Sequence, residues 1–227
     1  PALQVWHTAR LDAEFHARDA AAVSKLAGYL DQERRVFAEL DQLVAGHRQA
    51  AFPLGRYRPG GRNDPATFPV NWNRSFEMRP AEIRGAALLL HGLTDSPYSL
   101  RRTGEILCES GFYVLGLRLP GHGTVPASLA ESTRRDWRAA VRIGANHARA
   151  QVSPDAPFWI IGYSNGAALA LDHALAALAD PSLGRPTRLV LLSPAVGVSP
   201  FAAIGRWHRP LSVLPFFEKF RWHTVYP

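Results

Sequence analysis

Continuous apolar runs, separated by polar and glycine-containing stretches, dominate the middle of this chain. Each run is short, and its apolar residues follow one another without regular polar alternation. Runs of this kind are typical of strands that are buried on both faces of a sheet. They predict strands at Ala86–His91, Phe112–Leu117, Phe158–Ile161 and Thr187–Ser193.

Helical patterns fill the intervals between these strands. Ser96 and Pro97 are a plausible N-cap and first helical residue, and they predict a helix over 97–110. Thr133 with Asp136 resembles a capping box and predicts a helix that runs through Ala148. A further helix is expected directly after the third strand, at residues 164–179.

Strand and helix therefore alternate through the middle of the chain, which predicts an α/β domain. We expect a mostly parallel sheet with helices on both faces and right-handed crossovers. In such sheets the functional residues lie at the carboxyl ends of the strands. Four segments fall there: His91-Gly92-Leu93, Pro120–Thr124, Ser164 and Ser193-Pro194.

The flanking regions predict a chain of three parts. Apolar residues recur near helical spacing over 8–48, and the Gly- and Pro-rich stretch 51–65 follows, so residues 1–65 are expected to form a helical extension and a linker. Partial alternation over 69–79 predicts early strands that lead into the core at 66–193. Residues 194–227, rich in proline and aromatics, are expected to start a lid.

Two of these parts leave an alternative open. The helical extension is expected to pack on the main domain, and the other interpretation is a partner-binding arm. The lid segment could instead pack on the core.

Composition narrows the class of protein. The chain has 227 residues, 47% of them hydrophobic, without an apolar run of the length of a membrane span. Its net charge of +7 comes from arginines scattered along the chain, which argues against nucleic-acid binding; contact with an anionic membrane surface is the weaker alternative. The lone Cys108 excludes an intrachain disulfide and is expected in the core. No clustered metal-ligand spacing occurs, so neither a metal nor a cofactor is expected.

The most informative stretch is Gly162-Tyr163-Ser164-Asn165-Gly166, which lies between a strand pattern and a helix pattern. A sharp strand-to-helix turn strains the serine backbone, and the flanking glycines allow strand and helix to approach closely. The hydroxyl is then presented above a helix N-terminus, as a nucleophile requires. The alternative is an ordinary N-cap serine that holds backbone N–H groups.

Four segments in order resemble the α/β-hydrolase fold, and within it the monoacylglycerol-lipase-like and serine-aminopeptidase-like (S33) group. The resemblance covers roughly residues 70 to 200. It rests on Leu88–Arg101, Gly111–Pro126, Gly162–Leu171 and Leu189–Val196.

The resemblance implies roles for particular residues. Ser164 would be the nucleophile, and the backbone N–H groups of Leu93 and Asn165 would form the oxyanion hole. It also implies that His91 braces the oxyanion loop and that His122 organises the loop around it. Substrate contacts are expected from Gly92, Leu93, Tyr163, Phe201, Phe216 and Phe217.

The catalytic acid and histidine of that family follow the nucleophile, after two further strands. Asp172 and His173 lie on the helix after Ser164 and are expected to point away from its hydroxyl. In the lid segment, His208, His223 and Glu218 have no strand to position them. We therefore expect the triad acid and histidine, with the C-terminal part of the fold, to be absent from this chain.

The resulting functional hypothesis is a serine hydrolase that cleaves carboxylic esters, of lipid-like type, through an acyl-enzyme on Ser164. A serine peptidase or thioesterase is the alternative within the same fold. From another class, a non-catalytic binding module of hydrolase fold stays open. The sequence leaves the oligomeric state open, and it fits a cytoplasmic protein as well as an exported or lipid-anchored one.

Overall fold

The computed structural model describes residues 5–45 and 58–195. The chain divides into two units, Pro1–Pro194 and Ala195–Pro227, and all that follows concerns the first. The predicted three-part division of the chain stays a prediction.

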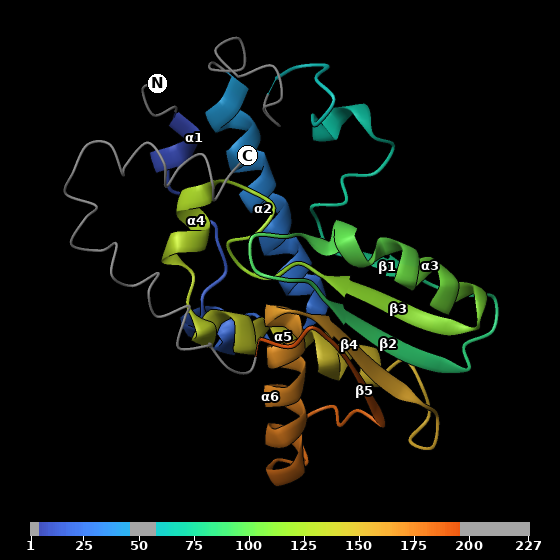
Figure 1. Cartoon of the computed structure of the whole chain (residues 1–227). Coiled ribbons are helices and arrows are strands. Elements are labelled where there is room, and N and C mark those ends of the chain that lie inside the picture. Colours follow the sequence, from blue (N-terminus) through green and yellow to red (C-terminus); the bar gives the residue numbers. More distant parts are fainter. Residues whose placement is uncertain (1–4, 46–57, 196–227) are drawn as a thin grey trace. The chain divides into compact units, whose positions relative to one another are not determined.

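The centre of this unit is a mixed sheet of strands in the order β1-β3-β2-β4-β5 (Figure 1). All pairs are parallel except β1 with β3, which is antiparallel. The mostly parallel α/β architecture predicted from the apolar runs is confirmed. The strands are β1 (Phe76–Met78), β2 (Gly85–Leu90), β3 (Phe112–Leu117), β4 (Phe158–Tyr163) and β5 (Arg188–Leu192).

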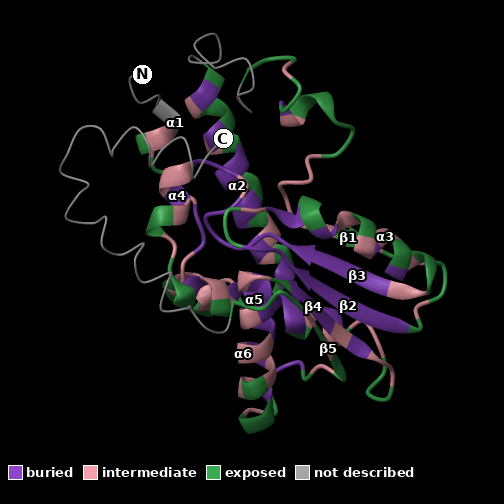
Figure 2. Ribbon diagram, in the orientation of Figure 1, coloured by how far each residue is buried: buried purple, intermediate pink, exposed green. Residues whose placement is uncertain are grey.

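Helices pack on both faces of the sheet. Successive residues of β2 point to opposite faces, so this strand contributes side chains to both interfaces. Leu88 and Leu90 join the cluster that includes Val141 of α5 (Arg134–Arg149). Leu89 points to the opposite face and packs with Leu107 of α3 (Arg101–Glu109). Every residue of β2 is therefore buried, as Figure 2 shows.

The remaining helices follow the local signals. Pro97–Leu100 is a 3-10 turn, η4, that leads into α3. The capping box at the start of α5 forms as predicted: Thr133 accepts from the Asp136 N–H, and the Asp136 carboxylate accepts from the Thr133 N–H. The short α4 (Pro126–Glu131) precedes it, and α6 (Asn165–Ala179) follows β4 directly.

Two local predictions hold only in part. The helical pattern over 8–48 forms one long helix, α2 (Leu26–Ala45), and before it lie only the short α1 (Val5–Thr8) and η1 (Ala17–Ala21). The chain is not helical around Glu14, and this carboxylate forms a buried ion pair with Arg118. In the segment 69–79 only β1 is a strand; residues 69–72 form bends and a turn, and the short η3 (Pro65–Thr67) precedes them.

The N-terminal segment belongs to the same core as the sheet. Leu26 and Tyr29 of α2 and Phe15 are buried in the cluster that covers β2 and β3. Further along α2, Val36 and Phe37 pack with Leu11 in a second cluster. None of the described helices is long and apolar enough to cross a membrane.

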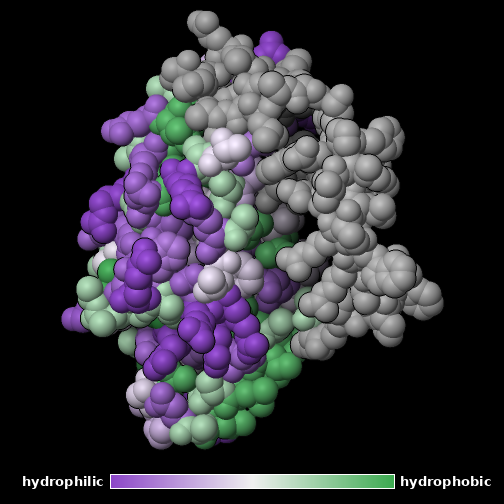
Figure 3. Space-filling view, turned by 90° about the vertical axis from the view of Figure 1, so that its left-hand side faces the viewer, coloured by the Kyte–Doolittle hydropathy of each residue, from purple (hydrophilic) through white to green (hydrophobic). Residues whose placement is uncertain are grey.

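The surface around α5 and α6 is mixed. Figure 3 shows hydrophilic side chains across the middle of this face and hydrophobic ones toward its lower edge, where α6 lies. Leu175 and Leu178 of α6 are the exposed apolar residues there, each more than half exposed. Arg134 and Arg138 of α5 are both paired with Asp172 of α6.

Candidate active site

Ser164 occupies the turn between β4 and α6 and has an unusual backbone. Its φ of 52° and ψ of −113° lie outside the regions that L-residues favour. The Ser164 N–H donates to the carbonyl of Leu192 at 2.9 Å, and its own carbonyl accepts from Ala167 and Ala168. The side-chain hydroxyl makes no cap hydrogen bond to α6. Ser164 therefore does not behave as an ordinary N-cap serine, and its hydroxyl stays available for chemistry.

Two glycines allow this turn because neighbouring backbone fills the space of a side chain. A Cβ at Gly162 would lie 2.5 Å from the Cα and N of Ala167. A Cβ at Gly166 would collide with the carbonyl oxygen of Leu90 and lie 2.5 Å from that of His91. Backbone atoms cannot move aside as a flexible side chain can, so both positions require glycine. The close approach holds Ser164 at the carboxyl end of β2.

The loop after β2 lies beside this turn. A Cβ at Gly92 would lie 3.5 Å from the Cβ of Ser164 and 3.0 Å from the ring of Tyr163. Leu93 follows, with its side chain about half exposed, and Thr94 has a φ of 62°. Asn165 is the first residue of α6, so its N–H has no partner within the helix. The structure thus brings the Gly92-Leu93 loop and the start of α6 to the same strand ends as Ser164.

His91 is fully buried, and both of its ring nitrogens have partners. Nε2 accepts from the Leu119 N–H at 3.1 Å, so the ring proton lies on Nδ1, which donates to the Gly92 carbonyl at 2.9 Å. Burial, and then the neighbouring His122, hold the pKa of His91 well below its usual range. His91 is therefore a neutral brace between the loops after β2 and β3.

His122, in the loop after β3, is also buried and also contacts a backbone carbonyl. Its Nδ1 lies 3.0 Å from the carbonyl oxygen of Pro120, and its ring packs edge-on against His91 with centroids 4.8 Å apart. Burial lowers the pKa of His122 to about 4. Its Nε2 is buried without a hydrogen-bond partner among the described residues.

Asp172 and His173 were expected to point away from the Ser164 hydroxyl, and both have other partners. Asp172 forms ion pairs with two arginines of α5, and His173 is buried with its Nε2 3.0 Å from the Gly184 carbonyl. Across 5–45 and 58–195, no histidine or carboxylate forms a hydrogen bond with the Ser164 hydroxyl, and no group of three metal-ligand side chains occurs. The expected substrate contacts Phe201, Phe216 and Phe217 lie outside the described residues. So do His208, Glu218 and His223, which were not expected to belong to the triad.

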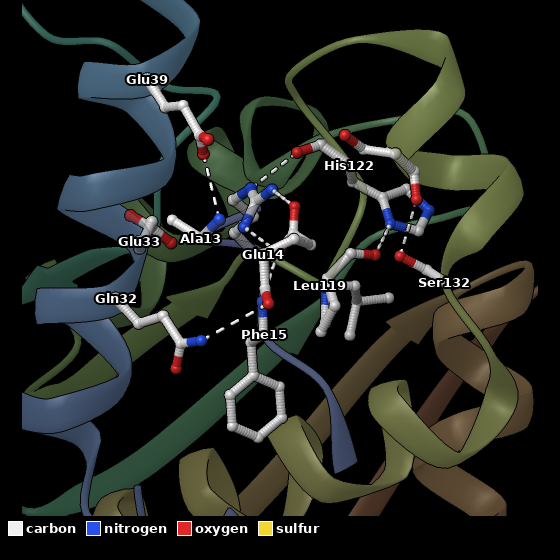
Figure 4. Close-up of polar contacts among 12 residues, drawn as sticks. Ala13, Glu14, Phe15, Gln32, Glu33, Glu39, Leu119, His122 and Ser132 are labelled. Atoms are coloured by element: carbon white, nitrogen blue, oxygen red, sulfur yellow. Dashed lines mark hydrogen bonds and ion pairs between the residues drawn. The ribbon is translucent and has the colours of Figure 1, made fainter. Parts of the chain in front are cut away.

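Sequence reasoning missed the residues that hold the loop after β3. The Arg118 guanidinium is 1% exposed and donates to both carboxylate oxygens of Glu14, at 3.1 and 2.5 Å. Its Nε donates to the His122 carbonyl at 2.6 Å. Figure 4 shows Glu14 in the centre, with Gln32 and Glu33 of α2 on one side of it and His122 on the other. The sequence offered one signal for this support: Arg118 lies between two apolar residues at the end of a buried strand. A buried arginine needs a paired carboxylate, so a partner such as Glu14 could have been sought.

Comparison with known proteins fits this arrangement. Residues 81–221, more than half of the chain, match the family described as serine aminopeptidase, S33. The chain belongs to the S33 serine aminopeptidase family. Its sheet and the helices on both faces are those of an α/β-hydrolase, as the sequence motifs predicted.

Particular relatives of this S33 chain are lipolytic enzymes. A thermostable monoacylglycerol lipase from Bacillus sp. (strain H-257) is 40% identical over 57 residues, which cover 25% of this chain and 23% of the lipase. A structure reported for the metagenome-derived lipolytic enzymes LipS and LipT is 29% identical, with a TM-score of 0.50. That match covers 59% of this chain and 51% of the other. The chain thus spans about half of the solved relative and less of the curated one.

Proposed function

We propose that this protein is a serine hydrolase that cleaves carboxylic esters, with Ser164 as its nucleophile. The observation that carries the proposal is the strained backbone of Ser164, at φ 52°, in a turn that tolerates only glycine at positions 162 and 166. Backbone strain persists only where the surrounding structure imposes it, and it concentrates at functional sites. A binding module of the same fold would have no use for a strained serine with a free hydroxyl.

The oxyanion hole is proposed to consist of the Leu93 and Asn165 backbone N–H groups. Ser164 attacks the ester carbonyl, and the negative charge that develops on the carbonyl oxygen is stabilised by these two donors. The alcohol leaves with a proton, and water then hydrolyses the acyl-enzyme to the free acid and regenerates the serine. The general base and its carboxylate are proposed to come from outside the described residues.

A lipid-like ester is the proposed substrate class, with Gly92, Leu93 and Tyr163 as contacts. Tyr163 and Leu93 are both exposed beside Ser164, at 42% and 49%, and supply apolar surface there. Relatives described as a monoacylglycerol lipase and as lipolytic enzymes support this choice over other acyl donors. The family's description as serine aminopeptidases favours a peptidase as the second candidate.

A fluorophosphonate probe tests the nucleophile because it reacts covalently with activated serines. We expect the wild-type protein to be labelled, Ser164→Ala to lose the label, and Ser153→Ala to keep it. Ser153 is a suitable control because it is an exposed serine in the turn before β4. Failure of the folded wild-type protein to react, or labelling of Ser164→Ala, would exclude the proposal.

The substrate class is tested by turnover of matched compounds. Monoacylglycerol and p-nitrophenyl esters are expected to be hydrolysed, and aminoacyl p-nitroanilides to be inert. The reverse preference would favour the peptidase.

A further inference from the structure

A row of hydrogen bonds leads from helix α2 to the peptide of Leu93. The Tyr29 hydroxyl donates to the carbonyl oxygen of Arg118 at 2.7 Å. The N–H on the other side of that same peptide belongs to Leu119, and it donates to His91 Nε2. His91 Nδ1 then donates to the carbonyl of Gly92, and this peptide carries the N–H of Leu93. Two peptides and one imidazole thus connect Tyr29 with a proposed oxyanion donor.

Every hydrogen bond in this row points in the same direction. The C=O and N–H of a trans peptide point to opposite sides, and no peptide bond within 5–45 or 58–195 is cis. Each peptide therefore accepts a proton at its oxygen and offers one at its nitrogen. Hydrogen bonds in series polarise one another, and the effect is strongest away from water. Tyr29 is 1% exposed and His91 0%, so the row is shielded from solvent from Tyr29 as far as the Gly92 carbonyl.

The beginning of the row is fixed by contacts of its own. The ring of Tyr29 packs edge-on against Phe15, with centroids 5.0 Å apart. The N–H of Arg118 donates to the Ser75 hydroxyl, which in turn donates to Glu33 of α2. Burial raises the pKa of Tyr29 well above its ordinary value, so its hydroxyl keeps the proton that it donates.

We propose that Tyr29 is a positioning residue for the oxyanion donor Leu93, acting through the Arg118–Leu119 peptide and His91; this inference rests on the proposed function. Tyr29 precedes residues 81–221, which match the family. The proposal therefore gives the N-terminal segment a part in catalysis as well as in stability. The Tyr29 hydroxyl orients the first peptide, His91 transmits that orientation, and the Gly92–Leu93 peptide presents its N–H to the oxyanion.

The test compares Tyr29→Phe with Tyr113→Phe in the full-length protein. Tyr113 is also fully buried, and its hydroxyl donates to Glu77 outside this row. Both variants lose one tyrosine hydroxyl and its hydrogen bond, which is buried for Tyr29 and part-buried for Tyr113. On a short-chain ester, Tyr29→Phe is expected to lower kcat about tenfold with KM unchanged, since removal of a whole donor lowers kcat by about 100-fold or more. Tyr113→Phe is expected to keep the wild-type kcat and KM.

A second measurement detects the row directly. In 1H–15N spectra, the amide proton of Leu93 is expected to shift in Tyr29→Phe and to keep its position in Tyr113→Phe. Equal kcat values for the two variants, or a Leu93 resonance that does not respond to Tyr29→Phe, would overturn the inference. Lack of turnover and of probe labelling in the wild-type protein would instead overturn the proposed function, and the wild type shows this before any variant is made.

Discussion

The two halves of the candidate site are held in different ways. The turn around Ser164 is held by backbone packing, because Gly162 and Gly166 bring strand and helix into contact. The loop with Gly92 and Leu93 is held by polar contacts that run through His91 to the loop after β3. There Arg118 pairs with Glu14, 104 positions away along the chain. One half is thus specified by a short local motif, and the other by side chains from the N-terminal segment.

The largest expected effect is that of a substitution in the turn around Ser164, the half of the site held by backbone packing. Gly166→Ala places a methyl group against the carbonyl oxygens of Leu90 and His91, and neither can move without distorting β2. Overpacking of this kind destabilises by about 3 kcal/mol or more, so we expect little folded protein. Circular dichroism and the yield of folded protein measure it.

Gly28→Ala is the matched control for that substitution. A Cβ there would meet only Val23, at an ordinary contact distance of 3.4 Å, and alanine favours the helix. A well-folded Gly166→Ala protein with wild-type stability would contradict the account of the turn.

The next largest effect is expected from a substitution among the polar contacts that hold the other half of the site. Glu14→Gln leaves the buried Arg118 guanidinium without its counter-charge, which is expected to lower the free energy of unfolding by about 3 kcal/mol. Urea denaturation measures the loss. Glu131→Gln, in the exposed pair with Arg10, is expected to change stability by less than about 1 kcal/mol. Equal losses of stability in the two variants would show that the buried ion pair contributes no more to stability than the exposed one.

Acid should also weaken the polar half. In the unfolded chain histidine titrates near about 6.5, whereas burial holds the pKa of His91 and His122 below that value in the fold. The unfolded state then binds more protons, so stability is retained above pH 6.5 and is lost as pH falls from there toward 4. The expected slope is about 1.4 kcal/mol per pH unit for each histidine.

His122→Asn isolates one of these contributions. The asparagine amide can still donate to the Pro120 carbonyl, but it does not titrate. Denaturation between pH 7 and 4 should therefore show a shallower slope than for the wild type. An unchanged slope would mean that His122 is not held neutral in the fold.

The smallest expected effect concerns the Ser75 hydroxyl, which links α2 to the start of the loop after β3. Ser75→Ala removes the hydroxyl that joins Glu33 to the Arg118 N–H, and is expected to lower stability by about 1 kcal/mol. Ser110→Ala removes an exposed bond to Ile106 and should change stability less. Thermal melts compare the two. A larger loss for Ser110→Ala would contradict the importance of the Ser75 bridge.

The parts of the structure that the sequence predicted correctly are those with local causes. Strands β2 to β5 followed from apolar runs, α5 from its capping box and the sharp turn at Ser164 from two glycines. The roles of Ser164, Leu93 and Asn165 stay predictions. The site's support could not be predicted, because Tyr29 and Glu14 lie in a segment whose helical pattern gave no indication of their partners near Arg118.

The separation between Glu14 and Arg118 has a kinetic consequence. Contacts between distant positions require closure of a long loop, so they form late and slow folding. We expect the turn at Ser164 and the strands beside it to form before residues 11–37 pack on them, and the loop after β3 to become ordered only afterwards. In refolding experiments we therefore expect recovery of turnover to lag behind recovery of secondary structure.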